Sequence, residues 1–190
     1  MEALDALLKR VSVTRLEEPA PDAAQREAIF RAALRAPDHG QLRPWRFLTV
    51  EGGAREALGE LFARAVAEKQ ADAEPAVLAK ARAKARAMPL RAPLLVVVIA
   101  CVQAHPKVPA QEQRLAAGCA AHGMLLAAHA QGVGAVWRSG ELSYDARVEA
   151  GLGLMENEEI VGFLYMGTPS GEPRTPPALD PADFVTAWRG

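Results

Sequence analysis

The chain has 190 residues, half of them hydrophobic, and a formal net charge of -1. This length fits one domain with a sizeable core, and the near-neutral charge does not favour a nucleic-acid-binding surface. The two cysteines, Cys101 and Cys119, form no CxxC pair. That spacing argues against a disulfide framework and a clustered metal site, and it favours a reducing, cytoplasmic setting.

Two helices are predicted at the start of the chain. Three leucines between residues 4 and 8 repeat at helical spacing and predict a short helix that ends near residue 10. After a proline-containing break at 19–21, Asp22 and Gln25 have the spacing of a capping box. The helix that they begin should end before Pro37, because proline cannot continue a helix.

Strands and helices alternate in the middle of the chain. Residues 45–50 have the β-branched and aromatic content of a strand, and helices are predicted around 58–65 and 76–87. The basic residues of 76–87 are expected to face solvent. The run 94–101 is continuously apolar and too short for an independent helix, so it predicts a central strand covered on both faces.

A long helix is predicted over 111–131, buried on all sides and ended by Gly132 in the left-handed backbone region. We do not expect a membrane span, because the apolar run is shorter than the ~20 residues needed and contains His122 and His129. The remaining pattern predicts a strand over 133–137, a helix over 146–152 and a strand over 160–166. The fold class is therefore α+β.

The end of the chain differs from the rest. Residues 1–167 are expected to form one domain, whereas 168–190 form a proline-rich arm without a core of its own. Phe184, Val185 and Trp188 near its end are costly to leave in water, which favours an arm that docks on a partner subunit.

Three segments carry polar residues that could bind a ligand. The first is Lys9 to Arg15, reading KRVSVTR, in which Arg10, Ser12 and Thr14 alternate with two valines. Alternation places polar groups on one side, where guanidinium and hydroxyl donors could bind a phosphate. An ordinary solvated loop is the alternative for this segment taken alone.

The second segment, Arg35 to Trp45, reads RAPDHGQLRPW and is a proline-bounded loop that contains Arg35, His39 and Gln41. Loops on rigid supports often carry binding groups. The arginine and glutamine donors suit a planar heteroaromatic ligand with carbonyls and ring nitrogens along one edge. A plain surface histidine is the alternative for His39.

The third segment, Gly134 to Gly140, reads GAVWRSG and follows a predicted strand. Trp137 offers a flat apolar wall and Arg138 a fixed positive charge. A cation held beside a redox-active ring stabilises the negative charge that develops on the ring. Core packing is the alternative role for Trp137.

In this order and at these separations, the three segments resemble the nitroreductase family, most closely its branch of small NAD(P)H nitroreductases. The resemblance runs nearly end to end and includes the runs LLVVVIAC, HPKVPAQEQ and IVGFLYMGTP. It implies a nitroreductase-like α+β fold, with a central, mainly antiparallel sheet flanked by helices, in an intertwined homodimer. It also implies non-covalent FMN at the subunit interface, and NADH or NADPH as the electron donor.

The resemblance assigns FMN contacts to eight residues: Arg10, Val11, Ser12, Arg35, His39, Trp137, Arg138 and Ser139. Arg10 and Ser12 would serve the phosphate and ribityl region. Val11 would contribute its main chain at a position where the family commonly has a second arginine, and Arg15 could compensate for the missing charge. Arg35 and His39 could reach FMN from the other subunit.

The implied activity is reduction of nitro compounds, or similar small oxidised organic acceptors, by ping-pong hydride transfer. No catalytic side chain and no metal site is predicted, since the sequence lacks a convincing triad, paired carboxylates or HExxH, and Cys119 with His122 makes only a pair. The alternatives are a quinone or enone reductase or a dehydrogenase on the same scaffold, an FMN-binding module or sensor without turnover, and a dimeric scaffold without the cofactor.

Overall fold

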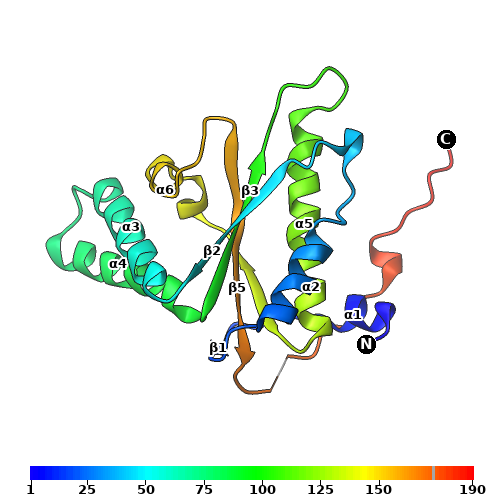
Figure 1. Cartoon of the computed structure of the whole chain (residues 1–190), viewed down its shortest axis with the longest axis horizontal. Coiled ribbons are helices and arrows are strands. Elements are labelled where there is room, and N and C mark those ends of the chain that lie inside the picture. The colour runs from blue at the N-terminus through cyan, green and yellow to red at the C-terminus, as the bar shows by residue number, and fades with distance from the viewer. Residues whose placement is uncertain (173) are drawn as a thin grey trace.

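The computed structural model of the chain describes residues 1–172 and 174–190, in which one sheet separates two layers of helices (Figure 1). The sheet runs in the order β1-β5-β3-β2, with β4 also paired to β5, and these pairings are antiparallel. The expected α+β class with a mainly antiparallel sheet is therefore confirmed. The strands are β1 (Leu16–Glu17), β2 (Trp45–Glu51), β3 (Leu94–Cys101), β4 (Gly134–Arg138) and β5 (Glu158–Pro169).

The helices lie where the apolar spacing predicts them. The two-residue strand β1 was not predicted, because a strand this short has no periodicity of its own. The helices are α1 (Ala3–Lys9), α2 (Ala23–Ala33), α3 (Gly53–Lys69), α4 (Pro75–Ala87), α5 (Ala110–Ala130) and α6 (Ala146–Gly151).

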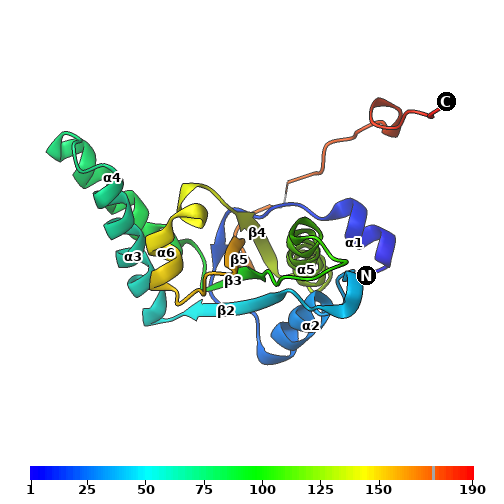
Figure 2. The same ribbon diagram turned by 90° about the horizontal axis from the view of Figure 1, so that it is seen from above.

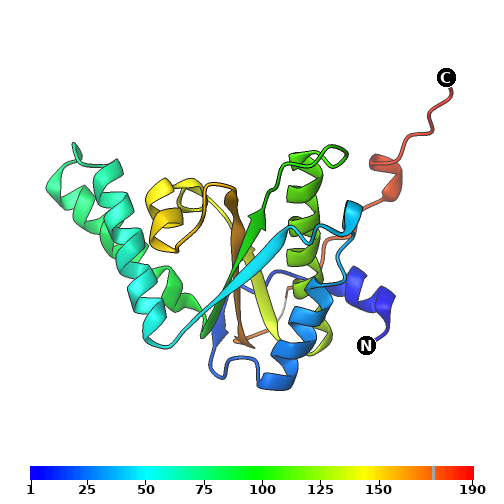
Figure 3. The ribbon, with the colours of Figure 1, turned by 45° about the horizontal axis from the view of Figure 1, so that its top comes forward.

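The strand β3 lies inside the sheet between β2 and β5, and all its residues except the last are buried. Its side chains alternate between the two helical layers. Val96 and Val98 belong to the core shared with α2 and α5, whereas Val97 and Ile99 belong to the core shared with α3 and α6. Figure 3 shows these layers on opposite sides of the sheet. The prediction of a strand covered on both faces is confirmed.

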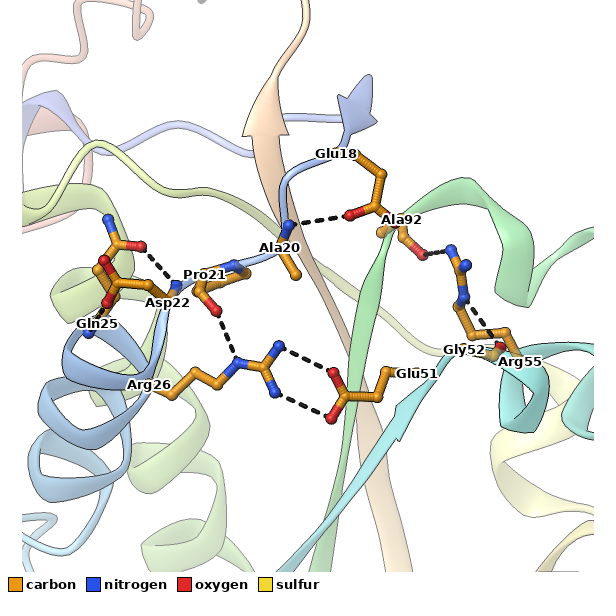
Figure 4. Close-up of polar contacts among 10 residues, drawn as sticks. All are labelled: Glu18, Ala20, Pro21, Asp22, Gln25, Arg26, Glu51, Gly52, Arg55 and Ala92. Carbon is orange, nitrogen blue, oxygen red and sulfur yellow. Dashed lines mark hydrogen bonds and ion pairs between the residues drawn. The ribbon is translucent and has the colours of Figure 1, made fainter.

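The start of α2 is held by its own cap and by an ion pair (Figure 4). Asp22 accepts a hydrogen bond from the Gln25 amide at 2.8 Å, and the Gln25 side chain accepts one from the Asp22 amide at 2.9 Å. The predicted capping box is thus confirmed. One residue further on, Arg26 donates two hydrogen bonds, of 3.0 and 2.9 Å, to the carboxylate of Glu51. This pair joins α2 to the end of β2.

A second arginine pair, the Arg46–Glu158 clamp, joins β2 to the start of β5. Arg46 donates two hydrogen bonds of 2.6 Å to Glu158, whose side chain is only 1% exposed. These bonds, with one from the Met155 amide, lower the pKa of Glu158 to about 2 despite its burial. Burial, together with the hydrogen bond to Glu158, raises the pKa of the neighbouring Cys101 thiol to about 11. The clamp is therefore a charged structural contact.

The helix α5 has one buried face and one exposed face. Ala117, Ala121 and Met124 are fully buried against the sheet, but Leu115 is 61% exposed and Cys119 is also exposed. The expectation of a helix buried on all sides is wrong for the single chain. Composition showed that the helix is apolar all round, but only the fold shows that the sheet and α2 cover one side of it. As predicted, Gly132 follows the helix with a positive φ of 75°.

The C-terminal segment leaves the body of the molecule (Figure 2). The strand β5 runs to Pro169, so it takes in the first two residues expected to belong to the arm. Of that arm, Pro173 lies outside the described residues. Phe184, Val185 and Trp188 are 73%, 73% and 92% exposed. Their apolar area therefore has no cover within the described part of this chain.

Candidate functional site

The third predicted segment lines a cavity of about 580 Å³ between the α3–α4 pair and the sheet. Trp137 and Arg138 reach it from the end of β4, and Ser139 from the loop that follows. Phe62 of α3 and Tyr165 of β5 form part of the apolar wall. We call this cavity the chamber. Its volume lies in the range of small-molecule sites, about 300–1,000 Å³.

Trp137 is held between the sheet and α5. A Cβ atom added to Gly162 on β5 would lie 2.1 Å from the Trp137 indole nitrogen, and one added to Gly118 on α5 would lie 3.9 Å from the ring. Glycine at position 162 is therefore required for the indole to lie this close to β5. Trp137 packs with the core on the α5 face of the sheet. Side chains alternate along β4, so the neighbouring Arg138, which lies over Tyr165, points to the opposite face, where the chamber lies. Core packing is therefore the main role of the Trp137 side chain in the single chain, and the residue borders the chamber only at the strand end.

The polar groups of the chamber are incompletely satisfied. The Arg138 guanidinium lies 5.5 Å from the centre of the Tyr165 ring, a cation–π contact. Burial raises the pKa of Tyr165, so its phenol stays neutral. The buried Nε of Arg138 and the hydroxyl of Ser143, a residue 2% exposed, have no hydrogen-bond partner in the described part of the chain. Buried polar groups without partners are uncommon and suit a bound ligand.

The first predicted segment contributes to a smaller pocket of about 250 Å³. Ser12, Thr14 and Arg15 line it together with Ser170 and Arg174 from beyond β5. The Ser170 amide donates a hydrogen bond of 3.1 Å to the Arg15 carbonyl, which holds the two segments together. Two guanidinium groups and three hydroxyls are the donor set expected around a phosphate, and their two positive charges exceed the one negative charge of Glu172, which also lines the pocket. The sequence did not reveal Ser170 and Arg174, because they lie far along the chain.

Arg10 and Val11 lie just outside this phosphate-type pocket. Arg10 immediately follows α1, and both residues are half-buried. Neither lines the chamber, the phosphate-type pocket or the pocket beside Arg35. The segment continues to Val13, whose amide donates a hydrogen bond of 2.9 Å to the Ala135 carbonyl of β4. The first segment is therefore fixed to the strand that presents Trp137 and Arg138.

The second predicted segment forms a strained loop. Gln41 and Arg43 have φ angles of 54° and 48°, in a region that side chains other than glycine rarely adopt. The Arg43 amide donates to the Asp38 carboxylate at 2.7 Å, and His39 Nδ1 lies 2.7 Å from Glu112 at the start of α5. A pocket of about 290 Å³, partly lined by Arg35, lies beside the loop.

One chain does not bring all three segments together. The second segment leads into β2 at one edge of the sheet, whereas the first and third meet at β4 on the other side of β3 and β5. At a strand spacing of about 4.8 Å, three steps across the sheet separate β2 from β4 by roughly 14 Å. Arg35 and His39 therefore lie apart from Trp137, Arg138 and Ser139.

Two cations of the chamber were not recognised in the sequence. The basic residues of α4 were expected to face solvent, and Lys80 and Arg82 do so. That interpretation is incomplete for Lys84, which is exposed but also lines the chamber with Arg91. Helical periodicity could not have found this, because it says nothing about which distant segment lies opposite α4.

Two further features of the described residues bear on the kind of site. No group of three or more His, Cys, Asp or Glu side chains is placed to hold a metal ion. Within the same residues, no helix combines the length and the apolar composition needed to cross a membrane.

Comparison with known proteins gives one consistent family. Residues 7–168 match the model of the "Nitroreductase family". The chain is 43% identical over 187 residues to "Putative NAD(P)H nitroreductase YdjA" of Escherichia coli, covering 98% of this chain and 99% of that protein. A Haemophilus influenzae protein named "Putative NAD(P)H nitroreductase" is 38% identical over 188 residues, with 98% and 99% covered.

Solved structures show the same fold. A nitroreductase-like protein from Bacillus cereus superposes with a TM-score of 0.85 at 22% identity, covering 100% of this chain and 97% of the other. A nitroreductase with bound FMN from Bacteroides fragilis superposes with a TM-score of 0.73 at 25% identity, with both chains fully covered.

Proposed function

This chain belongs to the nitroreductase family, and on that premise we propose that it is an FMN-dependent oxidoreductase that passes electrons from NADH or NADPH to a nitro compound or a similar small oxidised organic acceptor. The observation that supports this most strongly is the position of the phosphate-type pocket and the chamber. Segments fixed to the same strand, β4, offer guanidinium and hydroxyl donors in one place. In the other they offer the Arg138 guanidinium, whose buried Nε has no partner among the described residues, beside an apolar wall.

These residues fit FMN. Ser12, Arg15 and Arg174 would hold its phosphate, and Arg15 would supply charge that Val11 lacks. Trp137, next to Arg138 on β4, would border the flat ring system from the end of the strand. The buried Arg138 Nε would donate to the edge of the ring, where a fixed cation favours negative charge. When bound, FMN supplies a carrier that can be reduced by a nicotinamide and re-oxidised by a second substrate.

The overall reaction with a nitro acceptor needs no catalytic side chain. Two electrons and a proton leave NAD(P)H as hydride, a second proton comes from water, and the nitro group loses one oxygen as water to become nitroso. The chain's own task is to position both substrates in turn and to limit access of water. Tyr165 stays protonated and neutral in the chamber wall, so it adds no negative charge beside Arg138.

We further propose that the working form is a homodimer with two sites, each completed by the partner's second segment. The exposed face of α5, with Leu115 and Cys119, and the exposed Phe184 and Trp188 of the arm would be covered by the partner. Two copies related by a two-fold axis could bring Arg35 and His39 of one chain to the β4 edge of the other. A molar mass of two chains in light scattering is expected, and a single-chain mass would contradict this form.

The test of the proposed cofactor is the visible spectrum of the purified protein. We expect a yellow protein that releases intact FMN on denaturation, is bleached by NADH or NADPH without oxygen, and regains its colour with a nitroaromatic. Arg15→Ala, Arg35→Ala and Arg138→Ala should each weaken FMN binding about tenfold, the effect of losing one charge-assisted hydrogen bond.

The matched control is Arg31→Ala, because Arg31 pairs with Glu27 on the surface of α2, away from the chamber and the phosphate-type pocket. Its FMN affinity should equal that of the unaltered protein. A colourless protein that takes up no added FMN would overturn the proposal, as would unchanged FMN affinity in all three variants. A yellow protein that no nicotinamide bleaches would be an FMN-binding module.

A further inference from the structure

The chamber contains more positive charge than FMN requires. Arg138 is the cation beside Trp137, but Lys84 of α4 and Arg91 of the short helix Pro89–Arg91 also line the cavity. Neither belongs to the three segments that resemble the FMN-binding segments of the family. Both side chains are exposed, so they lie where a second ligand could reach them from solvent.

These cations have no carboxylate partner within residues 1–172 and 174–190. Most of the arginines on the outer surface of α2 to α6 have such a partner. One of them is Arg86, which lies two residues after Lys84 on α4 and pairs with Glu60. Among the described residues that line the chamber, Glu141 supplies the carboxylate. Its charge is already compensated by Lys69, whose ammonium nitrogen lies 2.8 Å away. The chamber therefore has an uncompensated positive field.

The rest of the wall suits an aromatic molecule. Phe62 and Phe163 make an edge-to-face pair with ring centres 5.4 Å apart, and both line the chamber beside Tyr165. All three side chains are at most 4% exposed, so they form a rigid apolar floor of the chamber. The Ser143 hydroxyl is buried, lines the same cavity and has no partner among the described residues, so it is available to donate to a ligand. Flat apolar walls with a few polar groups favour a planar ligand with a polar end.

We propose that the chamber selects a planar aromatic acceptor that carries a carboxylate, with Lys84 and Arg91 binding the carboxylate and the ring lying on the apolar floor. This inference rests on the proposed function and names its substrate class. A neutral acceptor would leave both cations without a partner and gain nothing from them. A carboxylate exchanges their hydration for charge-assisted hydrogen bonds, which are the stronger kind.

The experiment compares two acceptors that differ in charge but hardly in shape, para-nitrobenzoate and para-nitrobenzamide. The unaltered holoenzyme should have a kcat/KM for para-nitrobenzoate about tenfold or more above that for the amide. The double variant Lys84→Gln, Arg91→Gln should lose that preference, through a higher KM for para-nitrobenzoate, and keep its kcat/KM for the amide. Added salt should weaken the preference in the unaltered protein but not in the variant.

The matched control is the double variant Lys80→Gln, Arg82→Gln. It removes two positive charges from the same helix, at exposed positions that do not line the chamber. This control should behave as the unaltered protein. If this control loses the preference for para-nitrobenzoate as fully as the Lys84→Gln, Arg91→Gln variant does, the selection comes from the general charge of α4 and the proposal is wrong.

Two further measurements separate other roles of Lys84 and Arg91. An altered flavin midpoint potential in the Lys84→Gln, Arg91→Gln variant, without loss of charge discrimination, would assign the cations to the cofactor and overturn the proposal. Slower bleaching by NADPH with unchanged acceptor kinetics would assign them to the nucleotide phosphates and also overturn it.

Failure of the proposed function would look different. In that case neither acceptor is reduced, and equilibrium binding decides the inference. The Kd for para-nitrobenzoate, measured by quenching of tryptophan fluorescence, should then be about tenfold lower than the Kd for the amide. This difference should be lost in the Lys84→Gln, Arg91→Gln variant. Equal binding of both compounds would contradict the selection of a carboxylate.

Discussion

The two edges of the sheet use arginine in opposite ways. At the β2 edge, Arg26 and Arg46 each donate two hydrogen bonds to a glutamate, and the Glu158 carboxylate is almost fully buried. At the β4 edge, Arg138 has a buried nitrogen without a partner among the described residues, and Arg91 has no carboxylate there. The same side chain thus holds the fold together at one edge and is left available at the other.

The difference separates structural from ligand-binding charge. A guanidinium whose carboxylate partner is fixed by the fold contributes mainly to stability, and removing that partner leaves a charge uncompensated. A partly buried guanidinium without such a partner gains most when an anion arrives from solution. Substitutions at the β2 edge should therefore change the free energy of unfolding, and those at the β4 edge should change ligand binding.

The largest effect is expected at the Arg46–Glu158 clamp. Glu158→Ala should lower the free energy of unfolding by about 3–5 kcal/mol, because it leaves Arg46 and the Met155 amide without their buried acceptor. Urea denaturation of the FMN-free protein would measure this. The neighbouring Glu159→Ala is the matched control and should cost about 0–1 kcal/mol, since Glu159 and Arg114 are both about half-exposed. If both variants lose the same free energy of unfolding, the buried Arg46–Glu158 clamp stabilises the fold no more than an exposed ion pair, and the proposed structural role of the β2-edge arginines is wrong.

The reverse behaviour is expected at Arg138. Arg138→Gln should change the stability of the FMN-free protein by less than about 1 kcal/mol. In the unaltered protein, FMN at about 100 times its Kd should add about 2.7 kcal/mol to the free energy of unfolding, and a tenfold weaker Kd should reduce that gain by roughly 1.3 kcal/mol. Thermal unfolding with and without FMN checks both values. A large loss of stability without FMN would make Arg138 a structural residue.

The pH dependence of stability should also reflect the clamp. The folded-state pKa of Glu158 is about 2, below its ordinary value of 4.5, because Arg46 and a backbone amide bond to the ionised form. Its stabilising contribution is therefore complete above pH 4.5 and is lost as pH falls towards 2. The slope from this one group is at most about 1.4 kcal/mol per pH unit. Glu158→Gln should flatten the acid side of the stability curve, and an unchanged slope would assign the acid loss to other carboxylates.

Local signals predicted much of the architecture. The capping box at Asp22 and Gln25, the apolar run of β3 and the left-handed Gly132 were all identified from neighbouring residues. Each depends on backbone hydrogen bonding or on side-chain periodicity within one segment. Such effects are fixed by the order of residues along the chain, so they were readable without the fold.

Contacts across the sheet could not be predicted in this way. Arg46 and Glu158 lie 112 positions apart, and no periodicity in either segment indicates the other. The sequence indicated candidate binding segments that contain Arg10, Arg35 and Arg138, but not that Arg35 lies at the far edge of the sheet from Arg138 within one chain. That separation follows from the strand order.

The sequence by itself determined the helices, the central strand and the family resemblance, because these depend on local pattern and on the order of segments. Only the tertiary structure decided which face of α5 stays exposed, which arginines acquire carboxylate partners, and that Lys84 lines the same cavity as Arg138. The physical reason is that burial and pairing depend on neighbours brought together by chain topology. A residue's own segment does not specify those neighbours.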